Sequence, residues 1–123
     1  MIGTLKEAVD ERSFLEMLKK ILGTGVIRHS TLTGNKISRV AVCGGSGSFL
    51  IRDALASGAD IFITADIKYH QFFEAEGKML IADAGHFETE QFTKELIYNI
   101  LKEKFPTFAL RISRINTNAV HYL

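Results

Sequence analysis

A histidine and a carboxylate stand four positions apart in the second half of the chain, where they could hold a metal ion. His86 and Glu90 would share one face of a helix, so that an imidazole nitrogen and a carboxylate oxygen could reach the same cation. The same spacing suits a solvated histidine–glutamate hydrogen bond at a helix start, where the helix dipole favours a carboxylate. Because a zinc site uses three or four protein groups, two residues leave both interpretations open.

A second histidine–carboxylate pair, Asp66 and His70, has the same spacing and would lie at the start of the preceding helix. Thr64 comes just before this pair, and Asp83 comes just before His86. Each group follows an apolar segment typical of a buried strand, and the carboxyl ends of parallel strands meet at one sheet edge. We therefore expect Thr64, Asp66 and Asp83 to lie close together at that edge, with His70 on the helix that follows Asp66.

A glycine-rich turn follows another apolar segment and is a candidate anion site. Gly44, Gly45, Ser46 and Gly47 could bring backbone amides and a helix N-terminus close to a phosphate. The turn matches neither the dinucleotide fingerprint nor the P-loop, because no Lys-Ser/Thr follows it. A tight strand-to-helix turn of small residues explains it equally well. Cys43 is either a core thiol or a nucleophile.

Short apolar segments and helical patterns alternate along the chain and indicate the fold. Expected strands are 26–29, 37–43, 61–64, 79–82, 108–113 and 120–122, and expected helices are 13–22, 49–57, 68–76 and 88–104. The alternation predicts an α/β protein: a single layered sandwich with a mixed, centrally parallel sheet flanked by helices.

Several local features follow from the same pattern. Ser13 should cap the first helix, which Gly23 should end. His29 and His121 lie in expected strands and should be structural or surface groups. We expect one domain over residues 13–123, preceded by an arm or linker over residues 1–12. The core face of the last helix should comprise Leu96, Ile97, Ile100 and Leu101.

Composition narrows the class of protein. The chain has 123 residues, 46% of them hydrophobic, and a net charge of +1. These values exclude a disordered chain, and the charge leaves no whole-chain footprint for nucleic acid. No apolar stretch reaches the ~20 residues of a membrane span. A single cysteine excludes a disulfide within the chain and agrees with a reducing cytoplasm, where we expect the protein to be located.

Three motifs in order, and the chain's ending, resemble a known family. The segments are Val40–Gly47, Ala59–Asp66, Ala84–Glu90 and Asn116–Val120. Together they resemble the carboxyl-terminal lobe of the Nif-three-like family, which is also labelled GTP cyclohydrolase I type 2. The resemblance covers about residues 13–123, with alanine at position 119 where proline is common in the family.

The resemblance implies a bilobal α/β protein with two divalent metal ions in the cleft, assembled as a ring-like hexamer. His86 and Glu90 match the family's H-x-x-x-E ligands, of which the glutamate bridges two metals. Thr64-Ala65-Asp66 matches a T-G-E-like strand end with aspartate in place of glutamate, and His70 matches a nearby histidine. These residues, with Asp83, are therefore expected to line the pocket or to support the metal ligands. The implied activity is metal-dependent hydrolysis of an unassigned small molecule by the full-length homo-oligomer.

One departure from the family separates this chain from that activity. The family's amino-terminal lobe adds a histidine pair and an aspartate to the metal centre, and no such segment occurs here. We therefore expect a carboxyl-terminal half, a fragment or excised piece, that is inactive as an isolated chain. A non-catalytic interaction or assembly module, and an anion-binding α/β domain that uses the glycine turn, are the alternatives.

Overall fold

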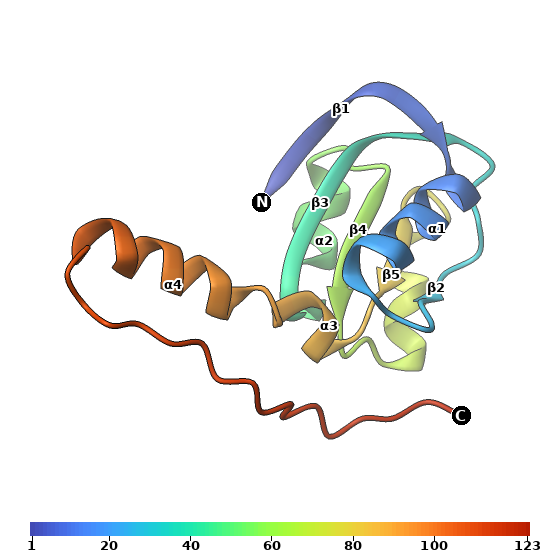
Figure 1. The fold of residues 1–123 in the computed structure, drawn as a ribbon. Coiled ribbons are helices and arrows are strands. Elements are labelled where there is room, and N and C mark those ends of the chain that lie inside the picture. The colour runs from blue at the N-terminus through green and yellow to red at the C-terminus, as the bar shows by residue number, and fades with distance from the viewer. The chain divides into compact units, whose positions relative to one another are not determined.

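The computed structural model describes residues 1–123 and divides the chain into two compact units, residues 1–89 and 90–123. The first unit is built on one sheet with the strand order β1-β3-β4-β5-β2 (Figure 1). The strands are β1 (Ile2–Asp10), β2 (Arg28–His29), β3 (Lys36–Ser46), β4 (Ile61–Ala65) and β5 (Leu80–Asp83). β3, β4 and β5 run parallel, and β1 and β2 pair antiparallel at the two edges. The predicted mixed, centrally parallel α/β sheet is confirmed.

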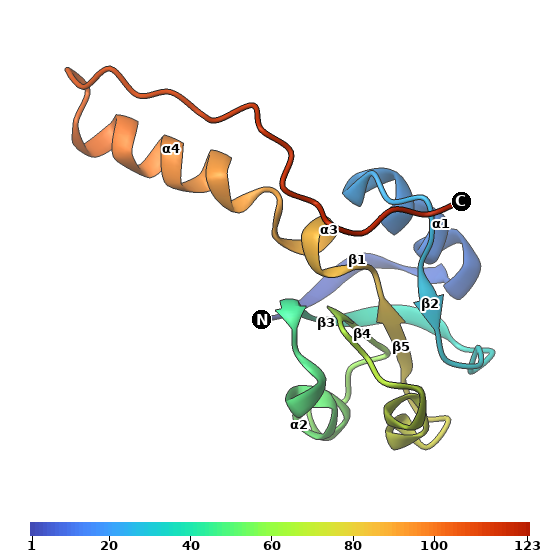
Figure 2. The ribbon, with the colours of Figure 1, turned by 90° about the horizontal axis from the view of Figure 1, so that it is seen from below.

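Helices cover both faces of this sheet, as Figure 2 shows. The helix α1 (Glu11–Leu22) packs on one face, and α2 (Ile51–Ala56) and the 3₁₀ helix η2 (Tyr69–Ala75) pack on the other. Successive strand residues point to opposite faces, so Ile61 and Ile63 join the α1 core while Phe62 joins the other core. β4 and β5 are buried on both faces, which explains their continuous apolar sequences.

The amino terminus differs from the expected arm. Residues 2–10 form β1, which pairs with β3. Its sequence lacks a clear alternation because the strand is an edge and most of its side chains are exposed. Asp10, not Ser13, caps α1, since its carboxylate accepts hydrogen bonds from the amides of Arg12 (3.0 Å) and Ser13 (3.1 Å). Gly23 ends α1 in the left-handed conformation, as predicted.

The glycine-rich segment continues β3 instead of breaking it. β3 extends to Ser46, and its pairing with β4 shifts register between Val42 and Ser46. Gly45 has a φ of 62° within this irregularity. A short 3₁₀ helix, η1 (Ser48–Leu50), then leads into α2. The segment is therefore a bulged strand end, for which a residue that tolerates positive φ is needed.

The carboxyl-terminal part of the chain departs most from the prediction. The expected long helix is two helices, α3 (His86–Glu90) and α4 (Thr93–Lys104), separated by a turn at Gln91 and Phe92. Residues 105–123 form no strand, because no strand of this chain pairs with them. The single domain predicted over residues 13–123 stays a prediction. No helix has both the length and the hydropathy needed to cross a membrane.

Candidate functional site

Asp66 and His86 meet at the carboxyl edge of the sheet. Asp66 follows β4 and His86 begins α3 just after β5, so two neighbouring parallel strands deliver them to one place. His86 Nδ1 lies 2.7 Å from Asp66 Oδ2, and each side chain is about half exposed. An ionised carboxylate can only accept, so Nδ1 carries the proton and donates. When the ring is neutral, the lone pair belongs to Nε2, which is the form in which histidine ligates metals.

The backbone on both sides of this pair is unusual. Asp66 has a φ of 57°, one of two non-glycine residues with positive φ, and Gly85 has a φ of 91°. Aspartate tolerates the left-handed region better than most residues. Lys68 is extended, so η2 begins only at Tyr69. Asp66 therefore lies outside the helix, and the prediction that Asp66 and His70 share a helix start is wrong.

Asp83 is a buried carboxylate that joins the two loops carrying the pair. It is 6% exposed and accepts hydrogen bonds from the amides of Ile67 (3.0 Å) and Gly85 (3.2 Å). It also forms an ion pair with Arg28. All of these contacts are to protein groups. Asp83 is thus a buried group that holds the two loops carrying Asp66 and His86.

Thr64 lies beneath the glycine turn and is fully buried. Its hydroxyl donates to the Gly45 carbonyl (3.0 Å), and the Gly45 amide donates to Thr89 Oγ1 (2.9 Å). Thr89 Oγ1 in turn lies 2.9 Å from the Gly85 carbonyl, to which it donates. Both polar backbone groups of Gly45 are therefore engaged within the protein. Anion binding by Gly44, Gly45, Ser46 and Gly47 stays a prediction.

The thiol of Cys43 and the imidazole of His29 lie outside this cluster. Cys43 is partly buried against the core that contains Phe62, and its Sγ lies 3.6 Å from the Gly44 carbonyl. His29 is exposed, with Nδ1 2.7 Å from the Ser30 carbonyl oxygen, and His121 is also exposed. These two histidines are surface groups.

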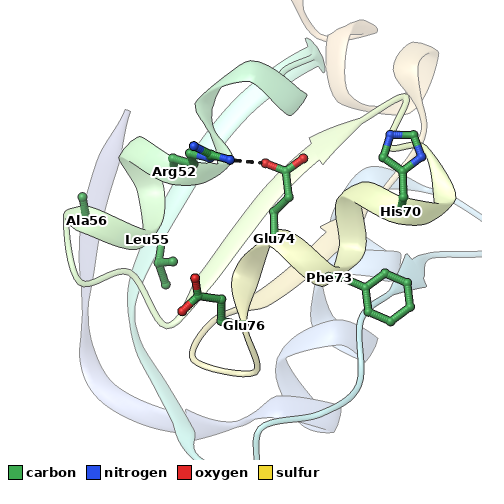
Figure 3. A pocket seen from close by; sticks show the side chains of 7 residues that line it. All are labelled: Arg52, Leu55, Ala56, His70, Phe73, Glu74 and Glu76. Carbon is green, nitrogen blue, oxygen red and sulfur yellow. Dashed lines mark ion pairs between the residues drawn. The ribbon is translucent and has the colours of Figure 1, made fainter.

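His70 lines an open pocket of about 590 Å³ between α2 and η2 (Figure 3). Arg52 Nε reaches toward Glu74 Oε2 across this pocket at 3.8 Å. A hydrogen bond from Lys78 lowers the pKa of the Glu76 carboxyl at the pocket's rim. The remaining lining residues are Leu55, Ala56 and Phe73. The pocket thus combines paired charges with an apolar wall.

The side chains at this edge of the sheet supply fewer donors than a metal ion needs. No group of three or more histidine, cysteine, aspartate or glutamate side chains is arranged to hold an ion within this chain. The Asp66–His86 hydrogen bond nevertheless matches the carboxylate–histidine arrangement that orients metal-ligating imidazoles. Glu90 ends α3, the helix that His86 begins. These residues fit one part of a metal site and do not complete it.

Three residues that the sequence did not single out belong to this cluster. Arg28 pairs with Asp83, and the strand register places them directly opposite each other, a relation visible only once β2 and β5 are paired. Glu88 is only 8% exposed despite its charge. Thr89 connects β3 to α3 through its hydroxyl. An S/T-type residue one turn into a helix gives no distinctive signal in a single sequence.

The fold and the site define an α/β lobe whose strand ends present a histidine oriented by a carboxylate. The sequence model of the family Duf34/NIF3 (NGG1p interacting factor 3) matches residues 1–119. The chain belongs to this family, and the resemblance seen in its motifs is confirmed.

Individual relatives agree with this assignment. A Streptococcus pneumoniae protein named "GTP cyclohydrolase 1 type 2 homolog" is 39% identical over 71% of this chain and 34% of its own length. A Staphylococcus epidermidis protein of the same name is 32% identical over 99% of this chain and 34% of its own length. The crystal structure of Staphylococcus aureus protein SA1388 has a TM-score of 0.84 at 25% identity, over 99% of this chain and 36% of that one. The chain therefore spans about a third of the length of these relatives.

Proposed function

We propose that this chain supplies one part of a dinuclear metal centre in a metal-dependent, hydrolase-like protein. His86 and Glu90 are the ligands, since one helix carries both at i, i+4 spacing. Asp66 orients His86, and its 2.7 Å hydrogen bond to Nδ1 is the observation that carries the proposal. Two divalent ions would supply Lewis acidity and an activated water for hydrolysis.

The types of ligand indicate which metal ions could bind, but they do not indicate the substrate. An imidazole together with carboxylates is compatible with manganese, iron, zinc and calcium. Glu90, with two carboxylate oxygens, is the group able to bridge two ions, as the family resemblance implies. The relatives' name supports a hydrolytic class, and the substrate of this protein stays unassigned. Thr64, His70 and Asp83 are proposed to line the metal-binding cleft or to support the metal ligands.

The first prediction tests the ligand role of His86. The His86→Ala variant is expected to bind Zn²⁺ or Mn²⁺ about tenfold more weakly than the unchanged chain, because it loses one of two local ligands. Isothermal titration of the purified chain with each metal measures the change. His29→Ala is the matched control, since His29 is an exposed surface histidine on β2. Equal affinities for all three proteins would refute the ligand role.

A second candidate function is assembly, and the exposed surface of α4 favours it. Residues 90–123 contain no buried residue. Four large apolar side chains on α4, the ones predicted to form its core face, are 36–61% exposed. They are Leu96, Ile97, Ile100 and Leu101. An amphipathic helix without a covered face is not stable by propensity alone.

We propose that a second lobe of the same family covers this α4 face. The SA1388 structure matches 99% of this chain, yet about two-thirds of that protein lies outside the match and is available to cover the equivalent helix. A second lobe would also supply the missing metal ligands. The homo-oligomer and the ring-like hexamer stay predictions, as does the cytoplasmic location that we infer from the single cysteine.

The second prediction concerns this α4 face. The chain is expected to form a complex with the part of SA1388 outside the match, and Ile97→Glu/Ile100→Glu should weaken it at least about 100-fold, since unpaired charges are costly to bury. Sedimentation velocity measures the complex. Asn99→Glu adds a charge to the opposite side of the same helix and should leave the complex intact. Self-association of the chain through the same residues, with no complex, would make a second copy the occupant instead.

A further inference from the structure

Arg28 connects three separate elements near the Asp66–His86 pair. Its guanidinium donates to the Asp83 carboxylate at the end of β5 and to the Ile67 carbonyl in the loop after β4. Its Cζ also lies 5.5 Å from the centre of the Phe72 ring on η2, within the range of a cation–π contact. One side chain from the edge strand β2 thus contacts the end of β5, the loop after β4 and η2.

The partners of this ion pair are the chain neighbours of Asp66 and His86. Asp83 accepts from the amide of Ile67, the residue after Asp66, at 3.0 Å. It also accepts from the amide of Gly85, the residue before His86, at 3.2 Å. The carboxylate therefore fixes the two loop backbones from which the paired side chains extend.

Fixing these backbones matters because the Asp66–His86 hydrogen bond joins side chains that extend from two different loops. Both side chains are about half exposed, so packing constrains them little. Asp66 also holds a φ of 57°, a conformation that persists only where surrounding contacts enforce it. The Ile67 amide, bonded to Asp83, is the first such contact after Asp66.

We propose that Arg28 and Asp83 are positioning residues that hold Asp66 in place to orient the His86 ring. The Arg28 side chain is 56% exposed but that of Asp83 is only 7% exposed, so the ion pair offsets the cost of burying the Asp83 charge. The role we propose for the ion pair is to fix the geometry of the loops that follow β4 and β5. The part of this proposal that concerns metal binding rests on the proposed function. The tautomer of the His86 ring can be measured without metal and does not depend on that function.

The third prediction tests this role with the metal-free chain labelled with ¹⁵N-histidine. At a pH where His86 is neutral, its long-range ¹H–¹⁵N spectrum should show the Nδ1–H tautomer, assigned by its loss in His86→Gln. In Arg28→Met the signal should shift toward the Nε2–H tautomer that a free imidazole prefers. Zn²⁺ affinity should fall by up to about tenfold, as for other groups that orient a ligand.

Arg52→Met is the matched control, because Arg52 is also an exposed arginine with a carboxylate partner, on α2. It should keep the Nδ1–H tautomer, whereas Asp66→Asn should lose it. Circular dichroism confirms that each variant is folded. An unchanged tautomer in folded Arg28→Met, with the tautomer lost in Asp66→Asn, would overturn the positioning role. A tautomer shift in Arg28→Met, together with Zn²⁺ binding that His86→Ala leaves unchanged, would support the positioning role while contradicting the ligand role of His86.

Discussion

Gly47→Ala is expected to destabilise the chain by about 3 kcal/mol, the upper end of the typical cost of overpacking a core. A Cβ at this position would lie 2.4 Å from Thr64 Oγ1 and 2.9 Å from Cys43 Cβ. Thr64 cannot withdraw easily, because it is fully buried in β4 and its hydroxyl donates to the Gly45 carbonyl. Moving it would cost that hydrogen bond as well as the packing.

Urea unfolding followed by circular dichroism measures this loss. Gly3→Ala is the matched control: no atom lies within 4 Å of its added Cβ and its φ is not positive, so stability should hardly change. Thr64→Ala removes the nearest clashing atom, so Gly47→Ala should cost less in that background. Equal costs in both backgrounds would show that contact with Thr64 is not the cause.

This result would decide between the two interpretations of the glycine turn in favour of packing. The sequence pattern could not separate a phosphate cradle from a tight turn, because both need small residues. The structure gives Gly45 a positive φ and Gly47 a close approach to Thr64, and each is a sufficient reason for glycine without a ligand. An anion site at this turn would have to rely on the remaining amides.

The central strands could be predicted from the sequence, and the edges could not. β4 and β5 are buried on both faces, so each is a short apolar run bounded by turns. β1 is mostly exposed and β2 has only two residues. What defines these edge strands is their pairing with β3 and β5, which is a tertiary relation. The same limit applies to α4, whose apolar pattern shows that a face exists but not what covers it.

The candidate site shows the same division between local and tertiary information. The rule that parallel strand ends converge correctly placed Asp66, Asp83 and His86 at one edge of the sheet. Spacing along the chain suggested that Asp66 pairs with His70, but the left-handed Asp66 and the extended Lys68 separate them from a common helix. The partner of Asp66 is His86, which lies twenty positions away. No periodicity in the sequence encodes that contact.

Gly85→Ala is expected to destabilise the chain by about 3 kcal/mol and to release His86 from Asp66. Gly85 has a φ of 91°, which costs a residue with a Cβ roughly 1–2 kcal/mol. Its Cβ would also lie 2.2 Å from Glu88 Oε2, and Glu88 is buried, so its carboxylate must move. Because His86 is the next residue, a shift of this turn moves the start of α3 and with it the imidazole.

Two control variants separate these causes. Gly34 has a φ of 80° with no atom within 4 Å of its Cβ, so Gly34→Ala should show the conformational cost alone. Gly85→Ala in a Glu88→Ala background should recover the part due to the clash. Urea unfolding gives the free energies, and the ¹⁵N signals of His86 report the ring. A Gly85→Ala chain that loses no more stability than Gly34→Ala and keeps the Nδ1–H tautomer would contradict the view that this turn sets the position of His86. If instead both effects appear, Gly85 joins Asp83 in positioning the His86 imidazole through the backbone of this turn.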